Sequence, residues 1–293
     1  VEFLAGDAGG NIGPTAGGVI SVLGNPDIAI VGSGNQLQLT DLVKWTTYVV
    51  DAVAGAAPYQ TIQAALTAAN TIGNPAVVLV RPGQYTENLT LYDGIDIWAA
   101  VGVADTLTCQ IIGVHTPPAS GTITIRNIAL QSATDVLNSA VAGSSEIIFI
   151  DCIVNVTNGY LFNLPNWTGT LVTFDLGNIG PNNGIVNNTG GATIFFTDAT
   201  LGAGSVNTMI VSGPTTLFNA HIRCPVSFQG TGTATVNGGC WFDRTITTAA
   251  TATVSCANTL FDTGANQAIS HGRSNELSLS NVTVDSSNNP SIG

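Results

Sequence analysis

A polar or glycine turn position recurs along the chain and constrains its fold more than any other sequence feature. Each such position follows a short apolar run, such as residues 147–150 or 171–174, and precedes an apolar or small residue. Units of about 22 residues, each holding two or three short strands and their turns, are typical of a parallel β-solenoid. The turn positions are Asn127, Asp151, Asp175, Asp198, Asn219, Gly239, Asn258 and Asn281, at intervals of 24, 24, 23, 21, 20, 19 and 23 residues.

In such a solenoid each strand pairs in parallel with the same strand of the next coil, about 4.8 Å away. A β-sandwich would instead show a turn every 8 to 12 residues or so, with hairpin chemistry between matching strands. The repeat therefore predicts an all-β, parallel solenoid from residue 77 onward. Its inward-facing positions are expected at or near Ile125, Ile150, Phe174, Phe196, Phe218 and Leu279.

Two segments precede the repeats. Residues 1–44 are rich in glycine and contain three alternating runs, at 19–23, 28–31 and 37–40, which predict a small β-module for attachment or oligomerisation. Residues 45–293 form the second predicted domain. Within it, residues 61–72 have apolar residues at helical spacing, with Thr61 as a fair N-cap and Gly73 as a fair end, so we expect one amphipathic helix there.

The stretch from residue 58 to residue 102 resembles the start of a pectin-lyase-like right-handed parallel β-helix. The residues that carry the resemblance are TIQAAL at 61–66 and RPGQYTENLTL at 81–91. In that family the helix covers the open end of the solenoid, so the resemblance implies a capping helix and a right-handed, single-stranded coil. The front end, with GPTAGG and IAIVGSGNQLQL, is similar to β-modules of phage tail fibres and tailspikes and of bacterial surface fibres.

Charge is scarce. The chain has 6 basic and 18 acidic residues, a formal net charge of -12, and only 8% charged residues. Because the basic residues stand singly, no basic stripe exists for nucleic acid. The apolar runs are too short and too interrupted for membrane insertion. Five widely spaced cysteines, with no CxxC pair and no histidine at zinc-ligand spacing, favour buried free thiols and argue against a metal or another cofactor.

Asp151 and Asp175 are the best candidates for catalysis. They stand one coil apart, so their side chains are expected to stack about 5 Å apart, which suits a retaining glycosidase. The same slot is filled by Asn or Asp in most other units, which favours the alternative that these residues cap turns by bonding the backbone of their own bend. The family's enzymes place basic residues beside their carboxylates, and the one lysine, Lys44, lies outside the repeats.

Aromatic rings are the candidates for glycan binding, since sugar faces stack on them. Trp167 and Trp241 are the two rings that we expect could do so. The three histidines carry weaker expectations: His115 in a loop, His221 with Arg223 as an exposed pair on a strand, and His271 with Arg273 and Glu276 in a loop between coils.

The sequence leaves three functions open. The leading interpretation is a non-enzymatic structural or adhesion subunit of a phage-tail-like or bacterial surface fibre, extracellular, on the cell surface or on a virion. It would associate with itself as a homotrimer or filament and possibly bind a cell-surface polysaccharide. The alternatives are a polysaccharide-degrading tailspike, either glycosidase or lyase, and a purely structural filament or sheath subunit.

Overall fold

The computed structural model describes residues 4–6, 10–12, 28–33, 36–41, 46–73, 75–100, 109–178, 185–201, 208–249, 251–262, 269–271 and 276–285. The chain divides into two compact units, Val1–Trp45 and Thr46–Gly293. Each is described here by itself.

The first unit contains two antiparallel pairs. β1 (Leu4–Gly6) pairs with β2 (Gly10–Ile12), and β3 (Ile28–Ser33) pairs with β4 (Gln36–Asp41). The β3–β4 hairpin confirms the strands expected at 28–31 and 37–40. The third expected strand, at 19–23, lies outside the described residues.

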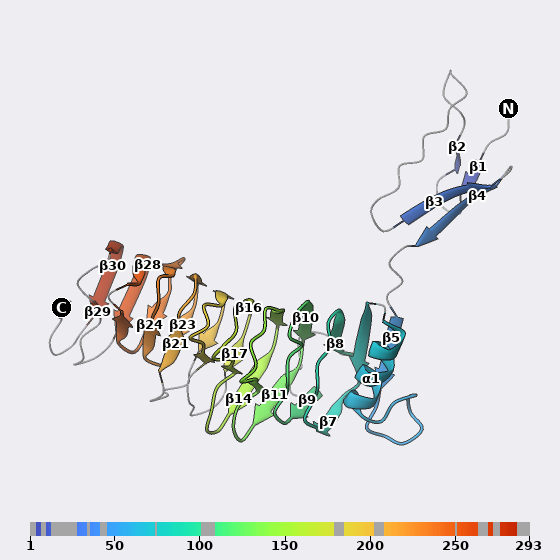
Figure 1. The fold of residues 1–293 in the computed structure, drawn as a ribbon, viewed down its shortest axis with the longest axis horizontal. Coiled ribbons are helices and arrows are strands. Elements are labelled where there is room, and N and C mark those ends of the chain that lie inside the picture. The colour runs from blue at the N-terminus through green and yellow to red at the C-terminus, as the bar shows by residue number, and fades with distance from the viewer. Residues whose placement is uncertain are drawn as a thin grey trace. The chain divides into compact units, whose positions relative to one another are not determined.

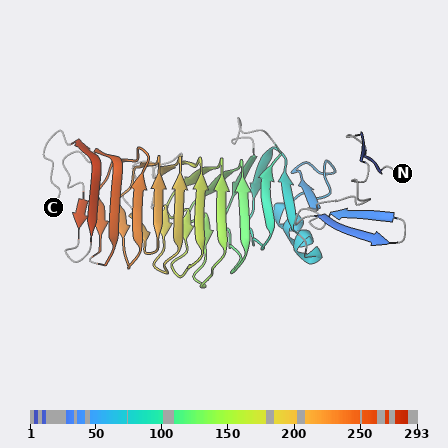
Figure 2. The ribbon, with the colours of Figure 1, turned by 90° about the horizontal axis from the view of Figure 1, so that it is seen from above.

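The second unit is a parallel β-solenoid (Figure 1), as the repeat predicts. In its main sheet the strands lie side by side and point the same way (Figure 2), and every printed pairing in this unit is parallel. The long strands of that sheet are β5 (Thr46–Val50), β6 (Ala76–Val80), β8 (Ile95–Ala99), β10 (Thr122–Arg126), β13 (Glu146–Ile150), β16 (Thr170–Phe174), β19 (Thr193–Thr197), β22 (Thr215–Phe218), β25 (Thr233–Asn237), β28 (Thr253–Asp262) and β30 (Leu277–Asp285).

Shorter strands complete each coil. The main sheet continues into β20 (Thr200–Leu201), β23 (His221–Ile222) and β26 (Trp241–Phe242). A five-stranded sheet holds β7 (Gly83–Thr86), β9 (Cys109–Ile112), β11 (Ala129–Ser132), β14 (Ile153–Val156) and β17 (Gly177–Asn178). A seven-stranded sheet holds β12 (Leu137–Asn138), β15 (Phe162–Asn163), β18 (Val186–Asn187), β21 (Met209–Val211), β24 (Val226–Phe228), β27 (Ile246–Thr248) and β29 (Ile269–His271).

The helix forms where the sequence predicts it. α1 (Ile62–Ile72) begins after Thr61, whose hydroxyl accepts from the Ala64 N–H at 3.2 Å, and it ends at Gly73, which has a left-handed φ of 72°. Its buried residues Ile62, Ala65, Leu66 and Ala69 form one face, and the helix contacts β5, β6 and β8. The apolar stripe therefore packs against the first strands of the main sheet.

A carboxylate from the coil secures the start of this helix. The two oxygens of Glu87 accept from the backbone N–H groups of Ile62 at 2.9 Å and Gln63 at 3.0 Å. Both donors lie in the first turn, where helical N–H groups have no partner within the helix and where negative charge is favoured. Glu87 thus ties α1 to the chain segment that follows β7.

The turn positions adopt one special backbone conformation. Asn127, Asp151, Asp175, Asp198, Asn219, Asn258 and Asn281 all have φ between 48° and 57°, the left-handed region, and Gly239 has φ 89°. Asn and Asp tolerate this region better than other non-glycine residues. The backbone N–H of each bend donates to the next coil, for example from Asp151 to Phe174 O at 3.0 Å and from Asp175 to Thr197 O at 3.2 Å.

The side chains of this ladder bond one another between coils. Asn219 donates to Asp198, Asn281 donates to Asn258 at 2.7 Å, and Asn258 donates to Asn237 at 3.1 Å. We expected each side chain to bond the backbone of its own bend. Side chains in equivalent slots are only about 4.8 Å apart in adjacent coils, so they reach each other directly.

The expected inward positions need a partial correction. Ile125 and Phe196 are buried, and the pairing register carries their column through Phe149, Thr173, Leu217, Val236 and Cys256 to Leu279. Leu279 is in this column but is 36% exposed, because it stands in β30, which pairs with β28 alone. Ile150, Phe174 and Phe218 occupy the neighbouring column, which faces outward. The prediction for these three residues was wrong by one position.

Candidate ligand-binding site

Four side chains from two adjacent coils meet on the outer wall of the solenoid. His221 begins β23 and Trp241 begins β26, and these residues pair in register. Arg223 and Asp243 follow the two strands, one residue beyond the buried pair Ile222 and Phe242. The alternation of a strand therefore brings all four side chains to the same outward face. We call this set of His221, Arg223, Trp241 and Asp243 the Trp241 cluster.

Ring stacking and hydrogen bonds fix the geometry of the cluster. The rings of His221 and Trp241 stack with centroids 4.5 Å apart and planes 17° from parallel. One Asp243 oxygen lies 2.9 Å from His221 Nε2, and the other accepts from Arg223 Nε at 3.2 Å. Because a carboxylate only accepts, His221 carries a proton on Nε2. Asp243 thus holds both neighbours in place while Trp241 stays 41% exposed.

A groove of about 300 Å³ lies beside the cluster, on the next coils. Leu260, which pairs in register with Trp241, lines it together with Thr283 from the coil after. The asparagine ladder forms another part of its wall, through Asn258 and Asn281. Amide, hydroxyl and apolar groups therefore continue the surface that the Trp241 ring begins. The remaining lining residues are Gly239, Cys240 and Thr259.

The arrangement can bind a polar ligand that has a flat apolar face. An exposed indole offers a surface for the C–H face of a sugar ring. Asp243 oxygens can accept further hydrogen bonds, and a guanidinium carries five N–H donors, of which Asp243 uses Nε–H. Donors and acceptors beside an aromatic ring match the hydroxyl groups at the edge of a sugar.

The other candidate tryptophan has a different place. Trp167 is 1% exposed, and its Nε1–H donates to Ser145 O at 3.1 Å. Its ring packs against Gly143, where even a single added Cβ would overlap it. Trp167 is therefore a core residue with no ring face open to a sugar, and of the two candidates only Trp241 is on the surface.

The candidate carboxylates occupy equivalent turns of adjacent coils. Ile150 and Phe174, which precede Asp151 and Asp175, pair in register, so the two bends stack as expected. The Asp151 carboxylate lies 3.7 Å from the Arg126 guanidinium, one coil below. Both residues have the left-handed backbone that they share with the rest of the ladder. Their part in catalysis stays a prediction.

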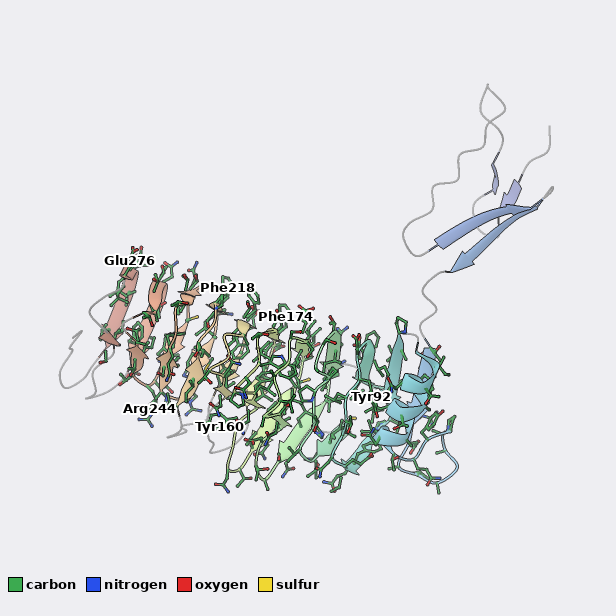
Figure 3. The ribbon with its side chains drawn as sticks, viewed as in Figure 1. Tyr92, Tyr160, Phe174, Phe218, Arg244 and Glu276 are labelled. Atoms are coloured by element: carbon green, nitrogen blue, oxygen red, sulfur yellow. The ribbon has the colours of Figure 1, made fainter. Side chains whose placement is uncertain are left out.

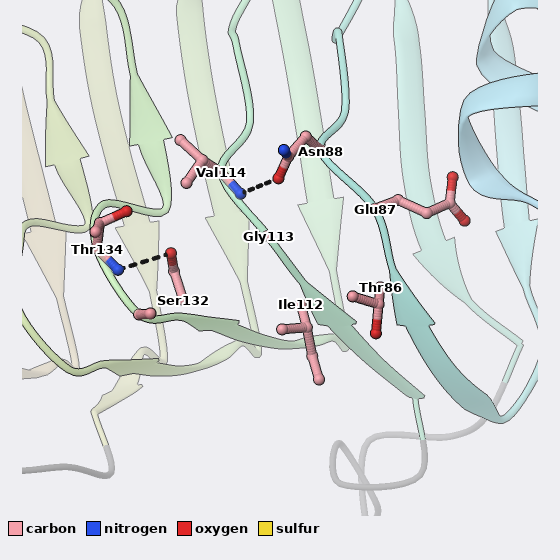
Figure 4. A pocket seen from close by; sticks show the side chains of 9 residues that line it. Thr86, Glu87, Asn88, Ile112, Gly113, Val114, Ser132 and Thr134 are labelled. Atoms are coloured by element: carbon pink, nitrogen blue, oxygen red, sulfur yellow. Dashed lines mark hydrogen bonds between the residues drawn. The ribbon is translucent and has the colours of Figure 1, made fainter.

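A second groove, of about 290 Å³, lies between three coils near the helix (Figure 4). It is lined mainly by backbone and by small side chains, with Asn88 Oδ1 accepting from the Val114 N–H at 2.9 Å. Glu87 is its one ionisable lining residue, and its carboxylate points away toward α1. This groove therefore offers little to grip a polar ligand.

The remaining reactive groups are buried. All five cysteines are free and buried, as expected, and burial raises the pKa of Cys109, Cys152, Cys224 and Cys256 to about 12. No group of three His, Cys, Asp or Glu side chains that could hold a metal occurs among the described residues. Within the same residues, no helix is both long and apolar enough to cross a membrane. His271 and Glu276 lie at strand ends, and Arg273 lies outside the described residues.

His115 departs from the sequence-based expectation of a loop position. It is 1% exposed and pairs with Leu137 at the head of an inward-facing column of the seven-stranded sheet. Its Nδ1 accepts from the Leu89 N–H at 3.2 Å. Burial lowers the pKa of His115 to about 4, so the ring is neutral at pH 7.

The sequence carried a signal for the Trp241 cluster that the motif analysis missed. The turn positions Asn219 and Gly239 are 20 residues apart, and the same offset places His221 beneath Trp241 and Arg223 beneath Asp243. Applying the repeat interval to residues outside the turns would have paired them. The earlier search looked for residues close in sequence, and it therefore kept His221 and Arg223 apart from Trp241.

Fold and site together define a parallel β-solenoid with an exposed aromatic cluster on its wall. Comparisons with protein-family models, with curated proteins and with solved structures find no match. The assignment of function therefore depends on the geometry of the chain itself.

Proposed function

We propose that this protein is a non-enzymatic adhesion subunit of an extracellular fibre, of the phage-tail-like or bacterial surface type, that binds a glycan at the Trp241 cluster. The observation that carries the proposal is an indole that is 41% exposed yet held in one orientation by stacking on His221. Exposing so large an apolar ring to water is unfavourable, and a ligand that stacks on it recovers that free energy.

The solenoid supports a role in a fibre. Parallel coils extend the molecule along one axis, and each coil depends on its neighbours, so length is added without a new core. The sequence likeness to pectin-lyase-like helices and to phage-fibre modules agrees with this proposal. Self-association and a location on a virion or cell surface belong to the same proposal.

Binding to polysaccharides tests the glycan part. The protein is titrated with neutral and acidic polysaccharides, for example galactomannan, amylose and polygalacturonate, while binding is measured by calorimetry. We expect Trp241→Ala to weaken binding at least tenfold, because loss of one stacking ring costs about 1 to 2 kcal/mol or more. Phe218→Ala is the matched control, since Phe218 is a ring of similar exposure, 46%, in a different column.

The result that overturns this part is a polysaccharide that binds equally to the parent and to Trp241→Ala, or no binding to any member of the panel. Iodide quenching of tryptophan fluorescence gives an independent readout. A bound glycan should shield Trp241, whereas Trp167 is already buried in the free protein.

The same incubations separate adhesion from degradation. Reducing ends report a hydrolase and unsaturated products report a lyase, and we expect neither. Cleavage by the parent protein that disappears in Asp151→Asn or Asp175→Asn would replace the adhesion proposal by a tailspike enzyme with a carboxylate pair.

A further inference from the structure

Four neighbouring strands of the main sheet carry apolar side chains on both faces. β13, β16, β19 and β22 read EIIFI, TLVTF, TIFFT and TTLF. Their inward residues fill the core of the solenoid, and the residues between them point outward. We call the outward set the phenylalanine face. It consists of Ile148, Ile150, Val172, Phe174, Phe195 and Phe218.

Three of these rings stand partly in solvent. Phe174 is 45% exposed, Phe195 42% and Phe218 46%. Phe174 and Phe218 project from the same side of the solenoid (Figure 3). An apolar patch with several large rings is uncommon on a monomer and marks an interaction site.

Neighbouring strands show that the solenoid does not need apolar residues there. In β25 the outward residues are Thr233, Thr235 and Asn237, while the inward residues Ala234 and Val236 are buried. A parallel strand that is apolar on both faces is typical of a sheet covered on both sides. The four strands from β13 to β22 therefore have the composition of a sheet that meets a second layer.

We propose that this second layer is another copy of the same chain, packed against the phenylalanine face. The inference names the contact surface for the self-association contained in the proposed function, and its test does not depend on any glycan. Two features of the face favour a second copy over a different partner.

The first feature is size. The eleven long strands of the main sheet, β5 to β30, are about five residues wide and stack at about 4.8 Å, which gives a face of roughly 16 Å by 50 Å, or about 800 Å². A stable protein interface buries about 800 Å² on each partner. The apolar strands lie in the middle of the stack and β25 and β28 flank them with Thr and Ser, so the face has an apolar centre and a polar rim.

The second feature is the match of the face to itself. Side chains form rows at the coil spacing, and a second copy presents rows at the same spacing, so rows can interdigitate along the whole sheet. The face also avoids the repulsion expected between molecules of charge -12. In the four apolar coils, Glu146 is the outward-facing ionisable residue of the strands, and Arg126 of β10 is paired with Asp151 at the edge.

The first experiment measures mass in solution by light scattering or sedimentation, using the full chain. Each ring is replaced by threonine in Phe174→Thr, Phe195→Thr and Phe218→Thr combined, because Thr124, Thr197 and Thr216 already occupy the same outward columns. We expect the parent to have a multiple of 29.8 kDa and the triple variant to dissociate at least 100-fold more readily. Trp241→Thr removes an exposed ring elsewhere and should leave the mass unchanged.

The second experiment keeps the proposal testable if the triple variant does not fold. All five native cysteines are buried, so Phe195→Cys introduces a single accessible thiol. A short bis-maleimide should then join two chains in high yield, whereas Trp241→Cys should stay at the mass of one chain. Each variant changes one surface residue.

The outcomes separate cleanly. A parent that is monomeric at 100 µM or so, or an oligomer that survives in the triple variant and does not cross-link through Phe195→Cys, overturns the inference. The second result would leave the adhesion proposal intact, with self-association through another surface. A triple variant that is monomeric but binds glycan like the parent supports the inference and separates it from the Trp241 cluster.

Discussion

His115 links the stability of the solenoid to pH through one buried ring. The pKa of His115 is about 4 in the folded protein, below its ordinary value of 6.5, so the unfolded chain binds more protons between these values. The free energy of unfolding should therefore fall as the pH drops from 6.5 to 4, by on the order of 3 kcal/mol from this group.

Denaturant unfolding at pH 7, 5.5 and 4 measures this change. His115→Asn is the control, because its amide oxygen can replace Nδ1 as acceptor for the Leu89 N–H but does not titrate. The difference in unfolding free energy between the two proteins should shrink as the pH falls. A difference that is the same at all three pH values would mean that His115 does not resist protonation.

Gly143 is held by a neighbour and not by its backbone. A Cβ at this position would overlap the ring of Trp167, which is buried and hydrogen-bonded to Ser145. We expect Gly143→Ala to destabilise the protein by about 1 to 3 kcal/mol, the range for an overpacked core. Gly177→Ala is the matched control, because a Cβ there would meet Ile153 at an ordinary 3.5 Å. Equal melting temperatures for the two variants would contradict this explanation.

At the scale of single elements, Glu87 is the residue that fastens α1. Its two carboxylate oxygens accept from the first-turn N–H groups of Ile62 and Gln63. Glu87→Ala leaves both donors without this partner and should cost about 2 kcal/mol. Glu87→Gln keeps one acceptor and should cost less. Chemical denaturation checks the order, and a Glu87→Ala protein as stable as the parent would show that the contact contributes nothing.

The strand β19 offers a direct test of register, because two consecutive rings face opposite ways. Phe196 is fully buried and Phe195 is exposed. Phe196→Asp places an unpaired charge in the core, which costs several kcal/mol, and should prevent folding. Phe195→Asp should fold, with a circular dichroism spectrum like that of the parent. If both variants fold or both fail, the register described here is wrong.

The elements also show how far sequence reasoning reaches. The repeat interval located all seven Asn and Asp residues with left-handed backbone, because few residue types tolerate that conformation. The same analysis placed Ile150, Phe174 and Phe218 inward. Strands such as EIIFI have apolar residues at every outward and inward position but one, so alternation cannot tell which face is which. Pairing with neighbouring coils decides it, and a single sequence does not display that.

At the scale of the whole molecule, net charge should oppose assembly. Copies of charge -12 repel each other, and salt screens that repulsion, since the Debye length falls from about 30 Å at 0.01 M to about 8 Å at 0.15 M. We expect association through the phenylalanine face to strengthen as NaCl is raised from about 0.01 M to about 0.15 M. Sedimentation at the two salt concentrations measures it. Weaker association at high salt would indicate an interface held by ion pairs instead.

The parallel register means that one coil is a removable unit of length. Residues 151–174 run from one ladder position to the residue before the next, and Ile150 and Phe174 pair in register. Joining Ile150 directly to Asp175 would bring β19 onto β13 with every inward column still aligned. A chain with that deletion should fold and be shorter by about 4.8 Å. The protein is thus graduated like a ruler, and its length can change by whole divisions without any new solution to the folding problem.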